Sequence, residues 1–215
     1  MIKGVIFDLD GTLIDSMKIW YSIDRRFLRE NGVTSPPEDI SDRMKKLTVD
    51  EAAEVFISEF SLSLTKPQVI SRIEELVREE YEEHIPLKPY AAEMAEYLGR
   101  KGIPCGVATA TYKSLAAAVL KRCRIADKFR FILTDAEYPM GKRFPDIFLG
   151  GAEMLGSAPG ETLVIEDSLH CIETAAAAGF LTAGVYDDAA AGDAGKIKRL
   201  ADYYFDDLSE LKRLV

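Results

Sequence analysis

In the segment Gly4-Val5-Ile6-Phe7-Asp8-Leu9-Asp10-Gly11-Thr12, an apolar run of β-forming residues ends in two carboxylates. Such a run so early in the chain predicts a central, buried strand. Side chains alternate along a strand, so we expect Asp8 and Asp10 to project to the same side. Crowded carboxylates repel each other unless a cation lies between them, and Mg²⁺ prefers oxygen ligands of this kind. The stretch therefore predicts a metal site at a strand end, and Gly11 permits the sharp turn that follows.

The overall composition predicts an acidic globular protein with small-molecule partners. The chain has 215 residues, of which 47% are hydrophobic, and a formal net charge of -9. This length and apolar content suffice for a full core. The negative charge argues against a nucleic-acid or anionic-membrane surface, because phosphate groups select clustered Lys and Arg. We therefore expect no nucleic-acid partner and no membrane partner.

Cysteine usage and the start of the chain indicate a cytoplasmic protein. Cys105, Cys123 and Cys171 form no Cys-x-x-Cys pair and lie in apolar or helical surroundings. We expect them to be reduced, buried thiols. The first strand begins almost at Met1, which leaves no room for a signal peptide, and no apolar run approaches the roughly 18 residues of a membrane helix.

Residues 16–85 are expected to form an all-helical cap domain. Apolar spacing predicts a helix over 17–31, which ends at a glycine and a Pro-Pro pair. Thr48 with Glu51 forms the pattern of a capping box, and Thr65 with Gln68 repeats it at the start of a third helix. Prolines at 86 and 89 end this region.

The rest of the chain alternates strands with helices, which predicts a parallel sheet covered on both faces. The fold class is therefore α/β, with a catalytic core domain formed by residues 1–15 and 86–215 and interrupted after its first strand by the helical insertion. Strands are expected at 103–108, 131–134, 163–166, 181–185 and 203–205. The two crossings, 14–16 and 87–90, would be hinges.

Polar residues follow several of these strands. Open parallel sheets bind ligands outside the carboxyl ends of their strands, so these residues form the candidate site. The second strand ends in Thr109-Ala110-Thr111, and the fourth ends in Glu166-Asp167-Ser168. Lys142 follows the third strand.

This set of four separated motifs resembles the haloacid dehalogenase superfamily, in its branch of small phosphatases and β-phosphoglucomutase-like enzymes. The resemblance covers nearly the whole chain and implies a Rossmann-like core domain with an inserted helical cap. The motifs are Asp8-Leu9-Asp10-Gly11-Thr12, Val107-Ala108-Thr109-Ala110, Gly141-Lys142 with Pro145-Asp146-Ile147-Phe148, and Ile165-Glu166-Asp167-Ser168. Dehalogenases lack the second acid of the first motif, so Asp10 indicates phosphoryl transfer.

The resemblance also implies residue roles. Asp8 would be the nucleophile that forms an aspartyl phosphate, and Asp10 the general acid and base. Lys142 and Thr109 complete the catalytic set, while Gly11, Ala110 and Thr111 belong to the phosphate-binding set. Mg²⁺ would be held by Asp8, the backbone carbonyl of Asp10, Asp167 and Glu166.

These roles predict a Mg²⁺-dependent phosphatase acting on a small phosphorylated metabolite, such as a sugar phosphate. A sugar phosphomutase is the first alternative, but Val49 stands where that branch has an arginine that binds phosphate. A non-catalytic binding module on the same fold is the second alternative. Candidate substrate contacts from the cap are Trp20, Arg43, Lys45 and Lys46.

Overall fold

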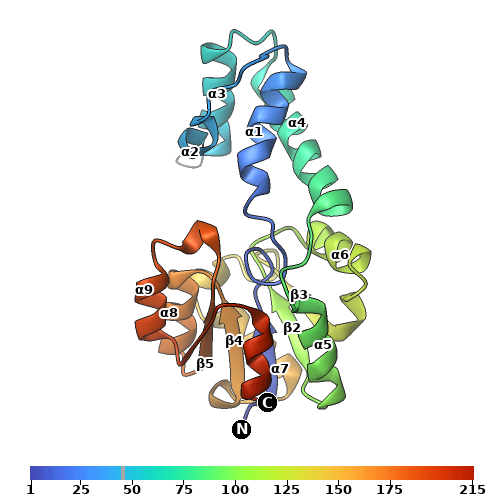
Figure 1. Cartoon of the computed structure of the whole chain (residues 1–215), viewed down its shortest axis with the longest axis vertical. Helices are drawn as coiled ribbons and strands as arrows, with labels where there is room; N and C mark the ends of the chain where they lie inside the picture. The colour runs from blue at the N-terminus through green and yellow to red at the C-terminus, as the bar shows by residue number, and fades with distance from the viewer. Residues whose placement is uncertain (45–46) are drawn as a thin grey trace. The chain divides into compact units, whose positions relative to one another are not determined.

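The structure is a computed structural model that describes residues 1–44 and 47–215 (Figure 1). The chain divides into two compact units. One comprises Met1–Asp15 and Pro86–Val215, and the other comprises Ser16–Ile85.

The first unit is built on a parallel sheet. Within the described residues, this sheet has six strands in the order β3-β2-β1-β4-β5-β6. The strands are β1 (Gly4–Phe7), β2 (Cys105–Ala108), β3 (Phe129–Leu133), β4 (Thr162–Glu166), β5 (Leu181–Val185) and β6 (Tyr203–Phe205). The α/β fold class predicted from the alternating pattern is therefore confirmed.

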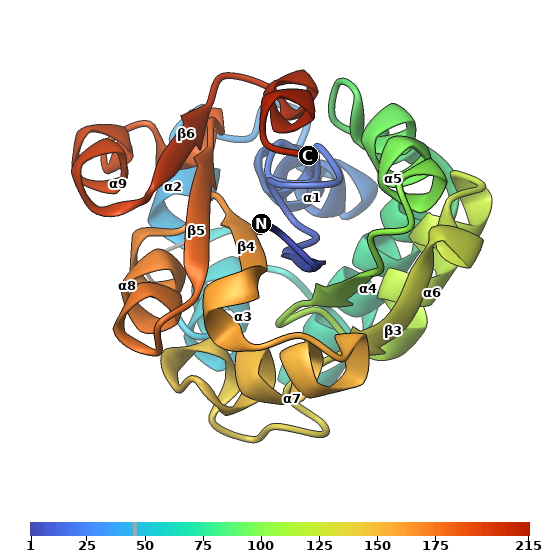
Figure 2. The same ribbon diagram turned by 90° about the horizontal axis from the view of Figure 1, so that it is seen from below.

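Helices cover both faces of this sheet. They are α5 (Ala91–Arg100), α6 (Lys113–Arg122), α7 (Asp146–Leu155), α8 (Leu169–Ala177) and α9 (Ala194–Leu200), with short 3-10 turns at Ala126–Lys128, Gly141–Arg143, Pro159–Glu161, Asp188–Ala190 and Leu208–Arg213. Figure 2 shows α7 and α8 on one face and α5 with α6 on the other. Residues of α7 and α8 share one hydrophobic cluster with Ile6, Phe131 and Val164 of the sheet.

Strand β1 lies inside the sheet, because it pairs with a strand on each side. Val5 pairs with Cys105 of β2 on one side and with Leu163 of β4 on the other. All four residues of β1 are buried, as expected of a strand covered on both faces. The carboxyl end of β1 therefore opens between the ends of β2 and β4, which places Asp8 in the middle of the sheet edge.

The second unit consists of helices alone among its described residues. They are α1 (Ile19–Glu30), α2 (Ile40–Met44), α3 (Val49–Glu59), α4 (Lys66–Glu79) and a π-helical turn at Glu80–His84. Glu51 accepts a hydrogen bond from the Thr48 backbone and returns one to the Thr48 hydroxyl, so the capping box predicted for α3 is confirmed. Helix α2 and the π-turn were not predicted.

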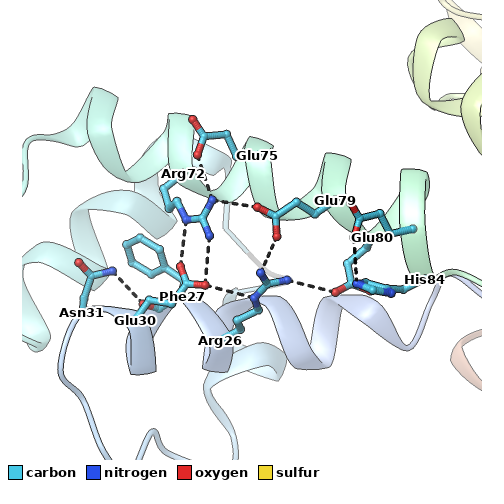
Figure 3. Close-up of polar contacts among 10 residues, drawn as sticks. Arg26, Phe27, Glu30, Asn31, Arg72, Glu75, Glu79, Glu80 and His84 are labelled. Carbon is cyan, nitrogen blue, oxygen red and sulfur yellow. Dashed lines mark hydrogen bonds and ion pairs between the residues drawn. The ribbon is translucent and has the colours of Figure 1, made fainter.

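Two arginines connect α1 to α4 (Figure 3). Arg72 of α4 donates two hydrogen bonds to Glu30 of α1, at 2.9 and 3.1 Å. Arg26 of α1 reaches Glu79 at 2.5 Å and Glu80 of the π-turn at 3.4 Å. Apart from Glu80, these side chains are about one-third exposed, so their contribution to stability is modest and screened by salt.

The two chain crossings between the units lie side by side. Ile14 forms an antiparallel bridge with Leu87. The backbone amide of Asp15 donates to the carbonyl of Pro86 at 3.0 Å, and the backbone amide of Lys88 donates to the carbonyl of Leu13 at 2.9 Å. The entry and exit of the helical unit are thus joined by backbone hydrogen bonds.

Two further expectations concern the cysteines and the membrane. Cys105 and Cys171 are buried free thiols, but Cys123 is only half-buried, so the expectation of burial is wrong for that residue because it caps the exposed end of α6. Across residues 1–44 and 47–215, no helix has both the length and the apolar character needed to span a membrane.

Candidate active site

Asp8, Lys142 and Glu166 form a buried ion cluster at the centre of the sheet edge. Asp8 follows β1, Glu166 ends β4, and Lys142 lies in the 3-10 turn before α7. The Lys142 Nζ lies 2.5 Å from Asp8 Oδ1 and 2.5 Å from Glu166 Oε1. The second Glu166 oxygen accepts a hydrogen bond from the Ser168 amide at 3.2 Å. Residues from two strand ends and from the turn before α7 are therefore brought together.

Asp167 extends this cluster. One carboxylate oxygen each from Asp8, Glu166 and Asp167 lies within 4.8 Å of the others. Gly11 makes this approach possible, because its φ is +85° and a Cβ at this position would come within 2.4 Å of Asp167 Oδ2. Gly11 thus adopts a backbone conformation that favours glycine and leaves room for a neighbouring carboxylate.

Burial and mutual repulsion dominate the electrostatics of the cluster. Burial raises the pKa of Asp8 well above its usual value, against the attraction of Lys142. Burial and the charge of Glu166 raise the pKa of Asp167 to about 7. Burial alone would lower the pKa of Lys142, but the charges of Asp8 and Glu166 reverse this and raise it. One ammonium therefore leaves the three carboxylates incompletely compensated.

The donor set fits a divalent metal ion. Asp8 Oδ2 is buried and accepts no hydrogen bond from any residue that the structure describes. A buried carboxylate oxygen without a donor is costly unless a cation compensates it. Asp8, Glu166 and Asp167 offer the hard oxygen ligands that Mg²⁺ prefers.

Asp10 accepts hydrogen bonds from hydroxyl groups that follow β2, and its charge contributes to the raised pKa of Asp8. The Thr111 hydroxyl donates to Asp10 Oδ2 at 2.6 Å, and the Thr109 hydroxyl lies 3.5 Å from the same oxygen. Thr109 is buried at the end of β2, whereas Ala110 is exposed. The Asp10 carboxylate is therefore held by polar side chains after β2, while the Asp8 carboxylate is held by Lys142.

A buried ion pair that the sequence does not indicate lies beside the cluster. Lys88 donates to Asp187 at 2.8 Å and to the Tyr186 carbonyl at 2.7 Å. The Asp187 side chain is 4% exposed, and its charge contributes to the raised pKa of Asp167. Asp187 follows β5, so the rule that polar residues matter at strand ends could have identified it.

The candidate substrate contacts expected from the helical unit are described only in part. Arg43 forms a two-contact ion pair with Glu59 of α3, one contact being 3.0 Å long. Trp20 lies in α1, but its side chain is outside the described part of the chain, as are Lys45 and Lys46 altogether. Val49 is exposed at the start of α3.

Comparison with known proteins identifies the family. The family description "haloacid dehalogenase-like hydrolase" matches residues 5–185, which include every motif of the site. The chain belongs to the haloacid dehalogenase-like hydrolase family. The expectation of an enzyme on this fold is thereby confirmed.

Named relatives cover most of the chain. It is 29% identical over 188 residues to N-acetylmuramic acid 6-phosphate phosphatase of Pseudomonas aeruginosa, covering 86% of this chain and 81% of that protein. It is 28% identical over 192 residues to β-phosphoglucomutase of Bacillus subtilis, covering 86% and 83%. A solved structure from Thermotoga maritima, described as a candidate β-phosphoglucomutase, superposes with a TM-score of 0.87 at 24% identity over the full length of both chains. That structure supports the fold.

Proposed function

We propose that the protein is a Mg²⁺-dependent phosphatase that hydrolyses a small phosphorylated metabolite, such as a sugar phosphate, through an aspartyl-phosphate intermediate. The observation that carries this proposal is the state of Asp8: one oxygen is bound by Lys142, and the other is buried with no hydrogen bond from a described residue. An oxygen without a donor keeps its lone pairs available for a metal ion or for phosphorus. The relatives named as phosphatases of phosphorylated carbohydrates support the substrate class.

In the first half-reaction, an oxygen of Asp8 attacks phosphorus and the bond from phosphorus to the substrate oxygen breaks. Asp10 gives its proton to the departing alkoxide. Lys142 holds Asp8 in place and supplies positive charge to the phosphoryl oxygens, to which Thr109 and the amide of Ala110 donate hydrogen bonds.

In the second half-reaction, Asp10 accepts a proton from water, whose oxygen attacks the aspartyl phosphate. The bond from phosphorus to the Asp8 oxygen breaks, which releases inorganic phosphate and restores the free Asp8 carboxylate. Asp8, Glu166, Asp167 and the carbonyl of Asp10 would hold Mg²⁺, which when bound neutralises charge on the phosphoryl group. The helical unit, as a cap, would exclude water while Asp8 reacts.

A sugar phosphomutase is the second candidate, favoured by the similarity to β-phosphoglucomutase. A mutase must retain and reorient a phosphorylated intermediate, which calls for a second anion anchor. Val49 offers no charge, and Arg43 is already paired with Glu59. These two positions favour hydrolysis.

A screen of phosphate esters tests the proposal. The protein is incubated with p-nitrophenyl phosphate and a panel of sugar phosphates, in Mg²⁺ and in EDTA, and inorganic phosphate is measured. We expect release in Mg²⁺ and loss of release in EDTA. Asp8→Asn should abolish turnover with an unchanged circular-dichroism spectrum, whereas the matched change at an exposed site, Asp206→Asn, should retain it. Turnover of Asp8→Asn at the rate of the unaltered protein would contradict the mechanism, and isomerisation without phosphate release would favour the mutase.

A further inference from the structure

The turn after β2 places the Thr111 hydroxyl against Asp10. The Thr109 amide donates to the Leu133 carbonyl of β3 at 3.0 Å, so Thr109 continues the strand pairing. The Thr109 hydroxyl oxygen then accepts a hydrogen bond from the Thr111 amide at 3.0 Å. These two contacts fix the backbone of the turn without using the Thr111 hydroxyl.

That hydroxyl instead donates to Asp10 Oδ2 at 2.6 Å. Hydrogen bonds between a hydroxyl and a carboxylate are short and strong compared with neutral pairs. The backbone on the other side is also anchored, because Asp10 forms a bridge with Ile14 and the Gly11 amide donates to the Ile14 carbonyl at 3.0 Å. The Asp10 carboxylate is thus tied to the end of β2 as well as to its own loop.

We propose that Thr111 is a positioning residue that orients the Asp10 carboxylate for proton transfer to the leaving group. This inference rests on the proposed phosphatase function. The resemblance placed Thr111 in the phosphate-binding set, but a hydroxyl whose hydrogen is donated to Asp10 cannot donate that hydrogen to a phosphate oxygen at the same time. The structure therefore assigns the hydroxyl to the acid that protonates the alkoxide.

This assignment has a chemical signature. An aliphatic alkoxide is a poor leaving group and needs its proton in the transition state, whereas p-nitrophenolate leaves without one. Loss of orientation at Asp10 should therefore slow aliphatic esters strongly and p-nitrophenyl phosphate weakly. A direct contact between Thr111 and phosphate would affect all esters alike, because every ester carries the same phosphoryl group.

The test compares Thr111→Val, which removes the hydroxyl at nearly constant shape, with Thr111→Ser, which keeps it. Substrates are p-nitrophenyl phosphate, phenyl phosphate and the sugar phosphate hydrolysed fastest in the screen. For Thr111→Val we expect kcat/KM to fall about tenfold or more on the sugar phosphate, about twofold on p-nitrophenyl phosphate, and between these on phenyl phosphate. Thr111→Ser should restore most of the loss.

A double-mutant cycle with Asp10→Asn separates positioning from direct contact. If Thr111 acts through Asp10, adding Thr111→Val to Asp10→Asn should cause no further loss on the sugar phosphate. A uniform loss over the three esters that persists beside Asp10→Asn would overturn the inference and leave the phosphatase function standing. So would an unchanged rate in Thr111→Val, or a uniform loss accompanied by a lower urea midpoint, which would point to turn stability. Absence of phosphate release by the unaltered protein would overturn the proposed function and this inference with it.

Discussion

Asp167→Asn is expected to stabilise the metal-free protein and to remove its response to Mg²⁺. In the fold, the pKa of Asp167 is raised from 3.8 to about 7, chiefly by burial and by the charge of Glu166. The folded state therefore binds this proton more tightly than the unfolded chain does. The resulting stability is fully present below pH 3.8 and is lost as the pH rises through about 7.

The size of the effect follows from this shift. Each pKa unit corresponds to about 1.4 kcal/mol, so ionising Asp167 between pH 5 and pH 8 costs about 2 to 3 kcal/mol of unfolding free energy. Asparagine is neutral and has nearly the same shape. At pH 8 in EDTA, the unfolding free energy of Asp167→Asn should exceed that of the unaltered protein by about 4 kcal/mol, and this difference should be about 2 to 3 kcal/mol smaller at pH 5.

Mg²⁺ should reduce this difference in unfolding free energy. Mg²⁺ at about 100 times its dissociation constant stabilises a protein by about 2.7 kcal/mol. We expect this gain at pH 8 in the unaltered protein and its near absence in Asp167→Asn, which lacks a carboxylate of the cluster. Urea unfolding followed by circular dichroism, at pH 5 and pH 8 with EDTA or Mg²⁺, measures all four conditions. Asp206→Asn, an exposed aspartate on the same unit, is the matched control. Equal stabilities of Asp167→Asn and the unaltered protein at pH 8 in EDTA would refute the reasoning.

Three further substitutions test separate features. Gly11→Ala should lower the unfolding free energy measured in urea by about 1 to 2 kcal/mol, because the φ of Gly11 is +85°. It should also weaken Mg²⁺ binding, measured by calorimetry, roughly tenfold or more, because the added Cβ would meet Asp167. An unchanged Mg²⁺ affinity would argue against this close approach. Lys88→Met should lower the unfolding free energy by about 3 kcal/mol, because it leaves the buried Asp187 carboxylate without its cation. Asp187→Asn added to Lys88→Met should recover part of this loss, and no recovery would show that the pair is not its source. Arg72→Met should cost about 1 kcal/mol at low salt and less in 1 M NaCl, since its ion pairs are partly exposed; a loss independent of salt would contradict this explanation.

The sheet could be predicted from the sequence because strand periodicity and turn residues are local signals. The strands at Leu181–Val185 and Tyr203–Phe205 lie at the expected positions. Strand β2 begins at Cys105, two residues later than expected, because Pro104 has no amide hydrogen to donate to a ladder. Helix α2 escaped prediction because its five residues are too few to show a helical period.

The site was predictable as a set of residues but not as a set of contacts. Strand-end motifs identified Asp8, Lys142 and Glu166, which the fold brings within hydrogen-bonding distance. The sequence alone gave no basis for choosing phosphate or Asp10 as the partner of Thr111, because that choice depends on how two separate strand ends meet. The partnership of Lys88 with Asp187 joins residues 99 positions apart and has no local signal.

Because the crossings at Ile14 and Leu87 are hydrogen-bonded to each other, the helical unit is an insertion whose two ends are held together by the sheet unit. Because the two ends of the insertion meet in a short ladder that belongs to the sheet unit, loops of very different length can close the same gap at small entropic cost. The length and content of the insertion can then vary through evolution while the sheet and its carboxylate cluster stay constant. Selection for a new substrate can therefore change the helical insertion without changing the residues that fold the sheet unit.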